Sequence, residues 1–278
     1  MPPFNFLPNT TFWQPENARW MAEAASLAYH GPAEIQAMAR TWGFDRFHFL
    51  DRKDTQGFVI AKNDMIIVAF RGTEITDLQD VMTDARIQLM KFPGRRGKAH
   101  TGFWGGLNLV WKDLLAIIQE EQKTAQPIFI TGHSLGGALA TLATARFRLE
   151  MDKPVNGLYT FGAPRAGDRD FASAFNADFK PRAFRYVNNN DVITRVPARE
   201  MNYSHVGTFL YFDAKGELHN DLALWNRFVE TVKGGLKDFL KPGPDFVKDH
   251  SMENYLANCK KRTNLSKRLV MADTLVDD

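Results

Sequence analysis

The chain of 278 residues carries 35 basic and 32 acidic residues, a formal net charge of +3, and 44% of its residues are hydrophobic. This length and apolar content fit one large α/β domain, so we expect residues 1–278 to form a single domain. Basic and acidic side chains are interspersed, which excludes a nucleic-acid-binding footprint. The only cysteine is Cys259, so an intrachain disulfide and a cysteine-rich metal site are both excluded.

The first residues lack the basic and apolar stretches of a secretory signal peptide. The longest apolar run, Met65–Phe70, is far too short to cross a membrane. The sequence therefore predicts a protein without a transmembrane anchor, either cytoplasmic or secreted without a visible signal peptide.

The first third of the chain predicts one helix and then a group of strands. The helix begins at Pro15, extends to about Tyr29 and ends at Gly31-Pro32. Three strands follow it, and Asn63-Asp64 forms the hairpin turn between the last two. These strands are Phe44–Leu50, Gly57–Lys62 and Met65–Phe70.

Helices and short strands alternate through the rest of the chain. The expected helices are Trp104–Gln122, Leu135–Leu149, Asp168–Phe179 with Asp168 as its N-cap, Asp221–Leu240 and Ser251–Asn258. The expected strands are Ile128–Thr131, Gly157–Phe161 and Phe184–Val187, followed by a hairpin of Val206–Phe212 with Glu217–His219. This order predicts an α/β fold with a mostly parallel central sheet that helices cover on both faces.

The stretch from Pro127 to Gly137 contains the pattern Gly-x-Ser-x-Gly, centred on Ser134. It follows an expected strand and precedes a helix rich in alanine and leucine. Such a sharp turn presents its serine to a substrate, and the helix N-terminus beside it favours negative charge. We therefore interpret Ser134 as a nucleophile. A glycine-rich turn with an incidental serine is the structural alternative, which this context disfavours.

A nucleophilic serine needs a base to take its proton and an acid to orient that base. In a strand-turn-helix site these partners follow in the order Ser, Asp or Glu, His. Asp191 fits the acid best, because it follows the expected strand Phe184–Val187 in a loop anchored by apolar residues. The base could be His205, His219 or His250. Even spacing along the chain favours His250, and His205 stays open on the residues alone. The neighbouring His133 is expected to be structural.

The tetrahedral intermediate of acyl transfer also requires an oxyanion hole. One N–H donor is expected from Leu135, the residue after the nucleophile, and the second from a loop after an earlier strand. Thr73 follows the strand Met65–Phe70 in such a loop and could supply both its N–H and its hydroxyl. An ordinary turn residue that caps the next helix is the alternative for Thr73.

Several short motifs occur in a fixed order: Phe70–Thr73, His100–Phe103, Gly132–Gly137, Thr160–Arg165, Asn190-Asp191 with Val196-Pro197, and Asp249-His250. Through them, residues 15–260 resemble the class 3 lipases, the fungal-type triacylglycerol lipases of the α/β-hydrolase fold. The resemblance implies a triad of Ser134, His250 and Asp191 and an oxyanion hole from Thr73 and Leu135. It thereby favours His250 over His205. One departure is that secreted fungal members commonly carry disulfides, which this chain lacks.

The resemblance also implies a short helical lid after Thr73, within residues 74–98. Ile75, Leu78, Val81 and Met82 lie there at helical spacing, with acidic residues between them. An amphipathic helix of this kind would cover an active site with its apolar face and open at a lipid surface. A fixed surface helix is the alternative.

The sequence thus predicts a serine carboxylester hydrolase, a lipase that cleaves acylglycerol esters through an acyl-enzyme and needs no cofactor and no metal. Its expected partner is a lipid or ester substrate, met at a lipid–water interface. A phospholipase A1 or a feruloyl-type esterase on the same scaffold is the alternative, and acyl transfer could replace hydrolysis. A non-catalytic lipase-like binding module is the alternative from another class.

Overall fold

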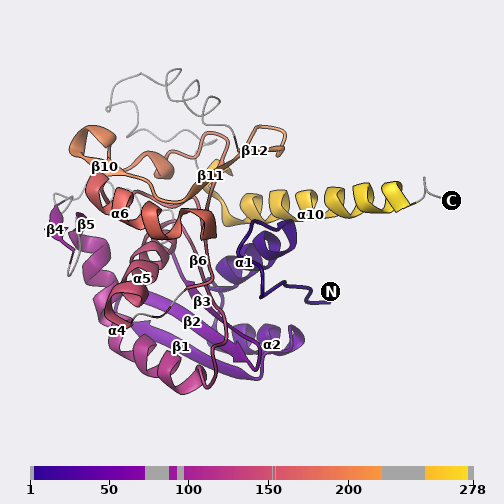
Figure 1. The fold of residues 1–278 in the computed structure, drawn as a ribbon, viewed down its shortest axis with the longest axis horizontal. Coiled ribbons are helices and arrows are strands. Elements are labelled where there is room, and N and C mark those ends of the chain that lie inside the picture. The colour runs from indigo at the N-terminus through magenta and orange to yellow at the C-terminus, as the bar shows by residue number, and fades with distance from the viewer. Residues whose placement is uncertain are drawn as a thin grey trace.

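The computed structural model describes residues 3–72, 88–92, 97–151, 153, 155–220 and 248–274. A central sheet has the strand order β1-β2-β3-β6-β7-β9-β11-β12 (Figure 1). The strands from β3 to β11 pair in parallel, and β1, β2 and β12 add antiparallel edges. Their bounds are β1 (Arg46–Arg52), β2 (Thr55–Lys62), β3 (Met65–Phe70), β6 (Ile128–His133), β7 (Gly157–Phe161), β9 (Ala183–Asn188), β11 (Thr208–Phe212) and β12 (Leu218–His219).

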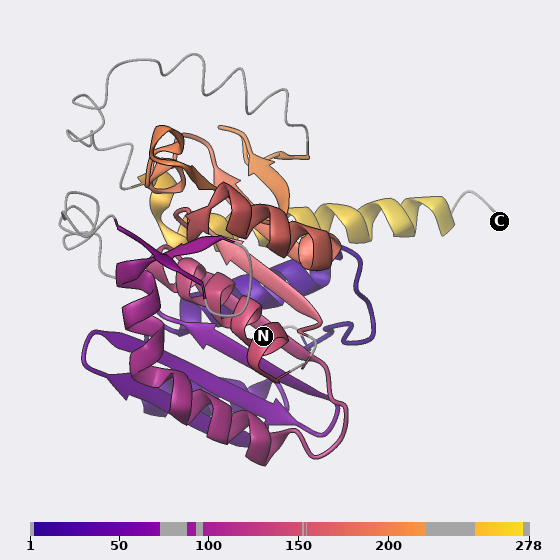
Figure 2. The same ribbon diagram turned by 60° about the vertical axis from the view of Figure 1, so that its left-hand side comes forward.

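Helices cover both faces of this sheet (Figure 2). One face packs against α1 (Pro15–Leu27), α2 (Pro32–Thr41) and α10 (Met252–Thr274), and the other packs against α4 (Thr101–Glu121), α5 (Leu135–Met151) and α6 (Arg169–Phe179). Successive side chains of a strand point to opposite faces. All six side chains of β3 are fully buried, alternating between the two cores. A strand covered on both faces has no position for a polar residue, which explains the apolar run in the sequence.

Four short strands form a second, smaller sheet with the order β10-β8-β5-β4. They are β4 (Leu89–Lys91), β5 (Lys98–His100), β8 (Gly167–Asp168) and β10 (Tyr203–Ser204). The sequence did not predict this sheet, because a strand of two or three residues is too short to display an alternating pattern. Short 3₁₀ turns complete the connections at η1 (Lys180–Arg182), η2 (Ile193–Arg195) and η3 (Arg199–Met201).

Two helices differ from the expectation. Gly31-Pro32 ends α1 as predicted, but Pro32 also begins α2, since proline fits the first helical position, where no N–H partner is needed. Helix α10 was expected to end near Asn258 and instead extends to Thr274, past the body of the domain (Figure 1). Its sequence contains neither glycine nor proline that would stop it. The helix expected at Asp221–Leu240 lies outside the described residues.

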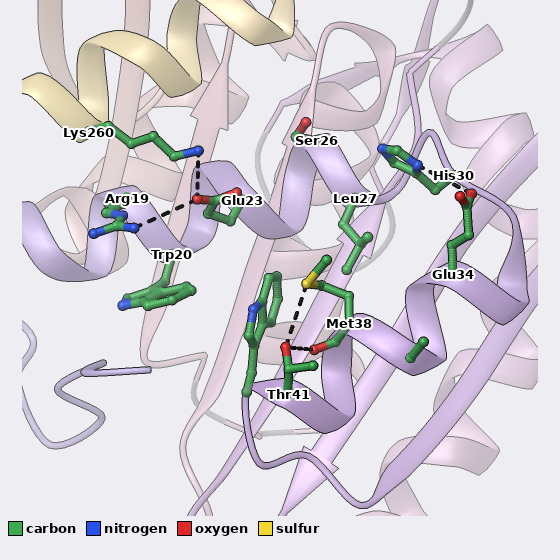
Figure 3. A pocket seen from close by; sticks show the side chains of 12 residues that line it. Arg19, Trp20, Glu23, Ser26, Leu27, His30, Glu34, Met38, Thr41 and Lys260 are labelled. Atoms are coloured by element: carbon green, nitrogen blue, oxygen red, sulfur yellow. Dashed lines mark hydrogen bonds and ion pairs between the residues drawn. The ribbon is translucent and has the colours of Figure 1, made fainter. Parts of the chain in front are cut away.

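None of the helices in the described ranges is long and apolar enough to span a membrane. A cavity of about 580 Å³ lies between α1, α2 and Lys260 of α10 (Figure 3). Trp20, Leu27 and Met38 line it, while Glu23 pairs with Lys260 at 2.9 Å. None of the predicted site residues lines this cavity.

Asp168 caps α6 and also joins that helix to the small sheet. Its Oδ1 accepts hydrogen bonds from the N–H groups of Phe171 at 2.8 Å and Lys98 at 2.9 Å, and the side chain is buried. We predict that Asp168→Ala lowers the free energy of unfolding by about 1–3 kcal/mol, measured by urea denaturation. Asp170→Ala, at an exposed position of the same helix, should cost less than about 0.5 kcal/mol. Equal losses in the two variants would contradict this role of Asp168.

Candidate active site

Residues predicted to act together lie at the carboxyl ends of neighbouring parallel strands. Ser134 follows β6, Asp191 lies in the loop after β9, and His250 lies two positions before the first residue of α10. Strand β7 lies between β6 and β9, and Gly162 follows its last residue. The carboxyl ends of an open α/β sheet are where such folds bind their ligands.

Ser134 occupies a sharp turn between β6 and α5. Its φ of 55° lies in the left-handed region, which costs a residue with a side chain about 1–3 kcal/mol. A Cβ on Gly132 would lie 2.2 Å from the carbonyl oxygen of Gly136, and one on Gly136 would lie 2.3 Å from that of Phe70. The two glycines therefore permit the close contact of strand and helix that bends the chain at Ser134. Its hydroxyl is buried and has no hydrogen-bond partner in the part of the chain that the structure describes.

Asp191 and His250 form a fully buried pair. The Nδ1 atom of His250 lies 3.0 Å from each carboxylate oxygen of Asp191, so Nδ1 carries the proton and donates it. The carboxylate also accepts hydrogen bonds from the N–H of Ile193 at 3.0 Å and the hydroxyl of Tyr255 at 2.6 Å. These bonds fix the carboxylate and, through it, the imidazole ring. The pair has the geometry of an orienting acid and a base whose Nε2 is left to accept a proton.

Gly162 packs directly against this pair. Its φ is +59°, and a Cβ at this position would lie 2.6 Å from Oδ2 of Asp191 and 3.0 Å from Nδ1 of His250. A side chain would therefore displace the carboxylate and the imidazole. Glycine is required here both for its backbone conformation and for the space it leaves.

His133 supports the backbone of His250. Its Nε2 lies 2.7 Å from the carbonyl oxygen of His250, and its Nδ1 lies 2.7 Å from the hydroxyl of Tyr29. A carbonyl can only accept, so Nε2 carries the proton and Nδ1 accepts from Tyr29. Burial, and then the nearby His250, lower the pKa of His133 well below its ordinary value. His133 is therefore neutral, and its contacts are structural.

The other two candidate histidines face different partners. His205 donates through Nε2 to the carbonyl of Thr194 at 2.6 Å, and desolvation together with Arg185 lowers its pKa well below the ordinary value. His219 lies 3.0 Å from the carboxylate of Asp213. Of the three histidines, His250 is the one that the fold brings to Asp191.

The expected oxyanion donors are partly described. Leu135 is the first residue of α5, where an N–H has no partner within the helix. A Cβ on Gly72 would lie 3.1 Å from that of Ser134, so the chain leading to Thr73 runs beside the nucleophile. Thr73 itself lies outside the described residues, as do the four lid positions Ile75, Leu78, Val81 and Met82. Within 74–98, the described residues include β4 and the first residue of β5.

Within the described ranges, no group of three or more His, Cys, Asp or Glu side chains is arranged to hold a metal ion. Cys259 is buried and unpaired with any other cysteine, and burial raises the pKa of its thiol far above neutral.

Comparison with known proteins finds a similarity to one family. Residues 67–201, slightly less than half of the chain, match the family model described as lipase (class 3). This segment is therefore similar to the class 3 lipases. The matched segment contains Ser134, Gly162 and Asp191, whereas His250 lies beyond it.

Similar proteins include a triacylglycerol lipase of Arabidopsis thaliana, 28% identical over an alignment of 250 residues, in which 69% of this chain and 48% of the relative are covered. A secreted mono- and diacylglycerol lipase of Penicillium cyclopium is 27% identical over 202 residues, or 70% of this chain and 64% of the relative. The chain thus spans less than two thirds of the length of either relative. The solved triacylglyceride lipase of Rhizomucor miehei superposes with a TM-score of 0.65 at 21% identity, covering 84% of this chain and 94% of that one. The α/β-hydrolase fold expected from the sequence is confirmed.

Sequence reasoning missed three groups around the Asp191–His250 pair. Tyr255 bonds to the carboxylate, Gly162 makes room for it, and Tyr29 holds His133. A tyrosine on the helix after a candidate base, and a glycine just past a central strand, are signals that could have found the first two. Tyr29 carries no such signal, because its role depends on a contact between residues 104 positions apart.

The buried neutral His133 makes the stability of this domain depend on pH. Its pKa is lowered in the folded state, so below about pH 6.5 the unfolded chain binds a proton that the folded chain does not. Above that pH His133 is neutral in both the folded and the unfolded chain, so it does not lower the free energy of unfolding. As the pH falls, we predict a loss from His133 of up to about 1.4 kcal/mol per pH unit.

Urea denaturation between about pH 7.5 and pH 5.5 measures this slope. His133→Gln removes the titrating ring, so the free energy of unfolding of this variant should change less per pH unit, by the effect of about one bound proton. This difference does not depend on the variant's stability at neutral pH. Identical slopes in the two proteins would show that His133 is not the titrating group.

Proposed function

We propose that this chain is a serine carboxylester hydrolase that acts on acylglycerol esters. The observation that carries the proposal is the buried Asp191–His250 pair, with Nδ1 of His250 3.0 Å from the carboxylate, at the strand ends where Ser134 occupies its strained turn. The match of residues 67–201 to the class 3 lipase family model supports the same reaction.

In the first half of the proposed reaction, the hydroxyl oxygen of Ser134 attacks the ester carbonyl carbon and His250 Nε2 takes the hydroxyl proton. Asp191 holds the ring and stabilises the imidazolium that forms. Collapse of the tetrahedral intermediate breaks the bond to the alcohol oxygen, and His250 returns its proton to that leaving oxygen. Water then attacks the acyl-enzyme with His250 again as the base, which releases the fatty acid and restores Ser134.

The negative charge on the carbonyl oxygen needs fixed donors. We assign one of them to the N–H of Leu135, at the N-terminus of α5, and the other to Thr73, the residue after Gly72. Removal of one such donor typically lowers kcat by about 10²–10³-fold. The segment 74–98 is proposed as the lid over this site, with the apolar positions Ile75, Leu78, Val81 and Met82 facing the substrate.

Acylglycerols are proposed as substrates because relatives carry the names triacylglycerol lipase and mono- and diacylglycerol lipase. The bonds that Asp191 and His250 make do not depend on the acyl chain or on the alcohol. They therefore support ester cleavage in general, and the acylglycerol preference is to be tested separately.

Substitution of the proposed triad tests the chemistry. We predict that Ser134→Ala and His250→Ala each lower ester hydrolysis by at least about 10⁴-fold, with unchanged circular dichroism spectra. His205→Gln is the matched control, since His205 bonds to the carbonyl of Thr194 and not to Asp191, and this variant should retain most activity. Comparable activity in Ser134→Ala would refute the mechanism, and a reversed order of the two histidine variants would reassign the base.

Substrate comparison tests the class. Hydrolysis of tributyrin, followed below and above its solubility limit, should rise faster than linearly once droplets form, because an apolar lid opens more favourably at a lipid surface. Preference for the sn-1 ester of phosphatidylcholine would indicate a phospholipase A1, and preference for feruloyl esters the corresponding esterase. Ester products formed with an added alcohol would indicate acyl transfer. Failure of a phosphonate probe to label Ser134 would indicate a non-catalytic binding module.

A further inference from the structure

Asp249 directly precedes the proposed base, yet its side chain contacts the loop of the proposed acid. Its Oδ2 accepts hydrogen bonds from Nδ2 of Asn189 at 3.0 Å and from the backbone N–H of Asn190 at 3.1 Å. Asn190 is the residue before Asp191. The Asp249 side chain is largely buried, with 8% of the residue exposed.

A third bond joins the end of β9 to the backbone of Asp249. Asn188, at the end of β9, donates from its Nδ2 to the backbone carbonyl of Asp249 at 2.9 Å. Its Oδ1 accepts from Nδ2 of Asn258 on α10 at 3.0 Å. The loops that carry Asp191 and His250 are thus connected by bonds on both the side chain and the backbone of Asp249.

The acid loop has a conformation that needs such support. Asn189 has a φ of 41°, in the left-handed region that a residue with a side chain seldom adopts. Its N–H donates to the carbonyl of Phe212 at 2.7 Å, and its side chain donates to Asp249. This turn directs the chain so that Asp191 meets His250.

We propose that Asp249 is a positioning residue for the reaction. It sets the distance between the acid loop, which follows β9 and carries Asp191, and the segment before α10 that carries His250. It thereby sets the alignment of Asp191 with His250. The inference rests on the proposed function. Asp249 acts through Asp191 and does not contact the reacting atoms. Loss of the connection misaligns the pair, and a displacement of about 1 Å at a catalytic group can lower a rate by about 10²-fold.

The test compares Asp249→Ala with Asp249→Asn and with a matched control. Asp213 and Asp249 both line a polar cavity of about 440 Å³. Asp213 accepts two backbone hydrogen bonds, from Lys215 and Glu217, but does not bond to the loop that carries Asp191. Asp249→Ala should lower kcat by about 10- to 100-fold with KM within about twofold. Asp249→Asn keeps an acceptor oxygen and should recover most of kcat, and Asp213→Ala should leave kcat near that of the wild type.

A role in stability alone would lower the melting temperature in Asp249→Ala and leave kcat unchanged at a temperature where the variant is folded. That result would overturn the proposal. The proposal would also fail if Asp213→Ala lost as much kcat as Asp249→Ala. It would fail as well if Asp249→Asn lost as much kcat as Asp249→Ala.

A second variant keeps the proposal testable if Asp249→Ala does not fold. In Asn189→Gly, glycine tolerates the positive φ of position 189, and the Nδ2 donor that bonds to Asp249 is removed. It should lower kcat less than Asp249→Ala, and where both fold, the double variant should match Asp249→Ala, because the two changes remove a shared bond. Wild-type kcat in Asn189→Gly, or fully additive losses, would contradict the connection.

A spectroscopic measurement separates this proposal from the proposed function. The proton that His250 Nδ1 donates to Asp191 should resonate far downfield and exchange slowly with water in the wild type, and it should exchange faster in Asp249→Ala but not in Asp213→Ala. Absence of ester hydrolysis by the wild type would refute the function while this measurement still tested the alignment. An unchanged exchange rate in Asp249→Ala would refute the positioning role even in an active enzyme.

Discussion

The hydrogen-bonded pair of Asp191 and His250 is the interaction on which the rest of the site depends. A carboxylate with no exposed surface is costly unless its oxygens are satisfied. Here the imidazole, the N–H of Ile193 and the hydroxyl of Tyr255 satisfy them. Each of these donors comes from a different element, so the pair can exist only when the loop after β9, the loop before α10 and α10 itself are in place.

The second constraint is the turn at Ser134, whose unfavourable φ is retained because β6 and α5 pack against each other in one shared core. The strands β3 and β6 are buried between two layers of helices, and two glycines let the strand and the helix touch where the turn occurs. Packing throughout the sheet thus stabilises a local conformation that the isolated segment would seldom adopt.

His133 adds no positive charge beside the pair. Its ring is tilted against that of His250, with ring centroids 4.6 Å apart, and burial keeps it neutral. A neutral ring at this distance would not repel an imidazolium on His250, as the proposed reaction requires. The hydrogen bond from His133 to the backbone of His250 also limits the movement of the base.

The sequence by itself determined the alternating α/β pattern, the buried strand Met65–Phe70, the serine turn and the order of acid and base, because periodicity, glycine spacing and motif order are local properties of the chain. It did not determine the small sheet, the full length of α10 or helix α2, whose signals were too short or resembled a stop. Spacing and motif order favoured His250, and the folded structure places it against Asp191. The groups that hold the pair, Tyr255, Gly162 and Asp249 among them, are known from the folded structure alone. Those contacts join residues about 60 positions apart or more, or depend on the exact path of a loop, and no spacing along one chain encodes them.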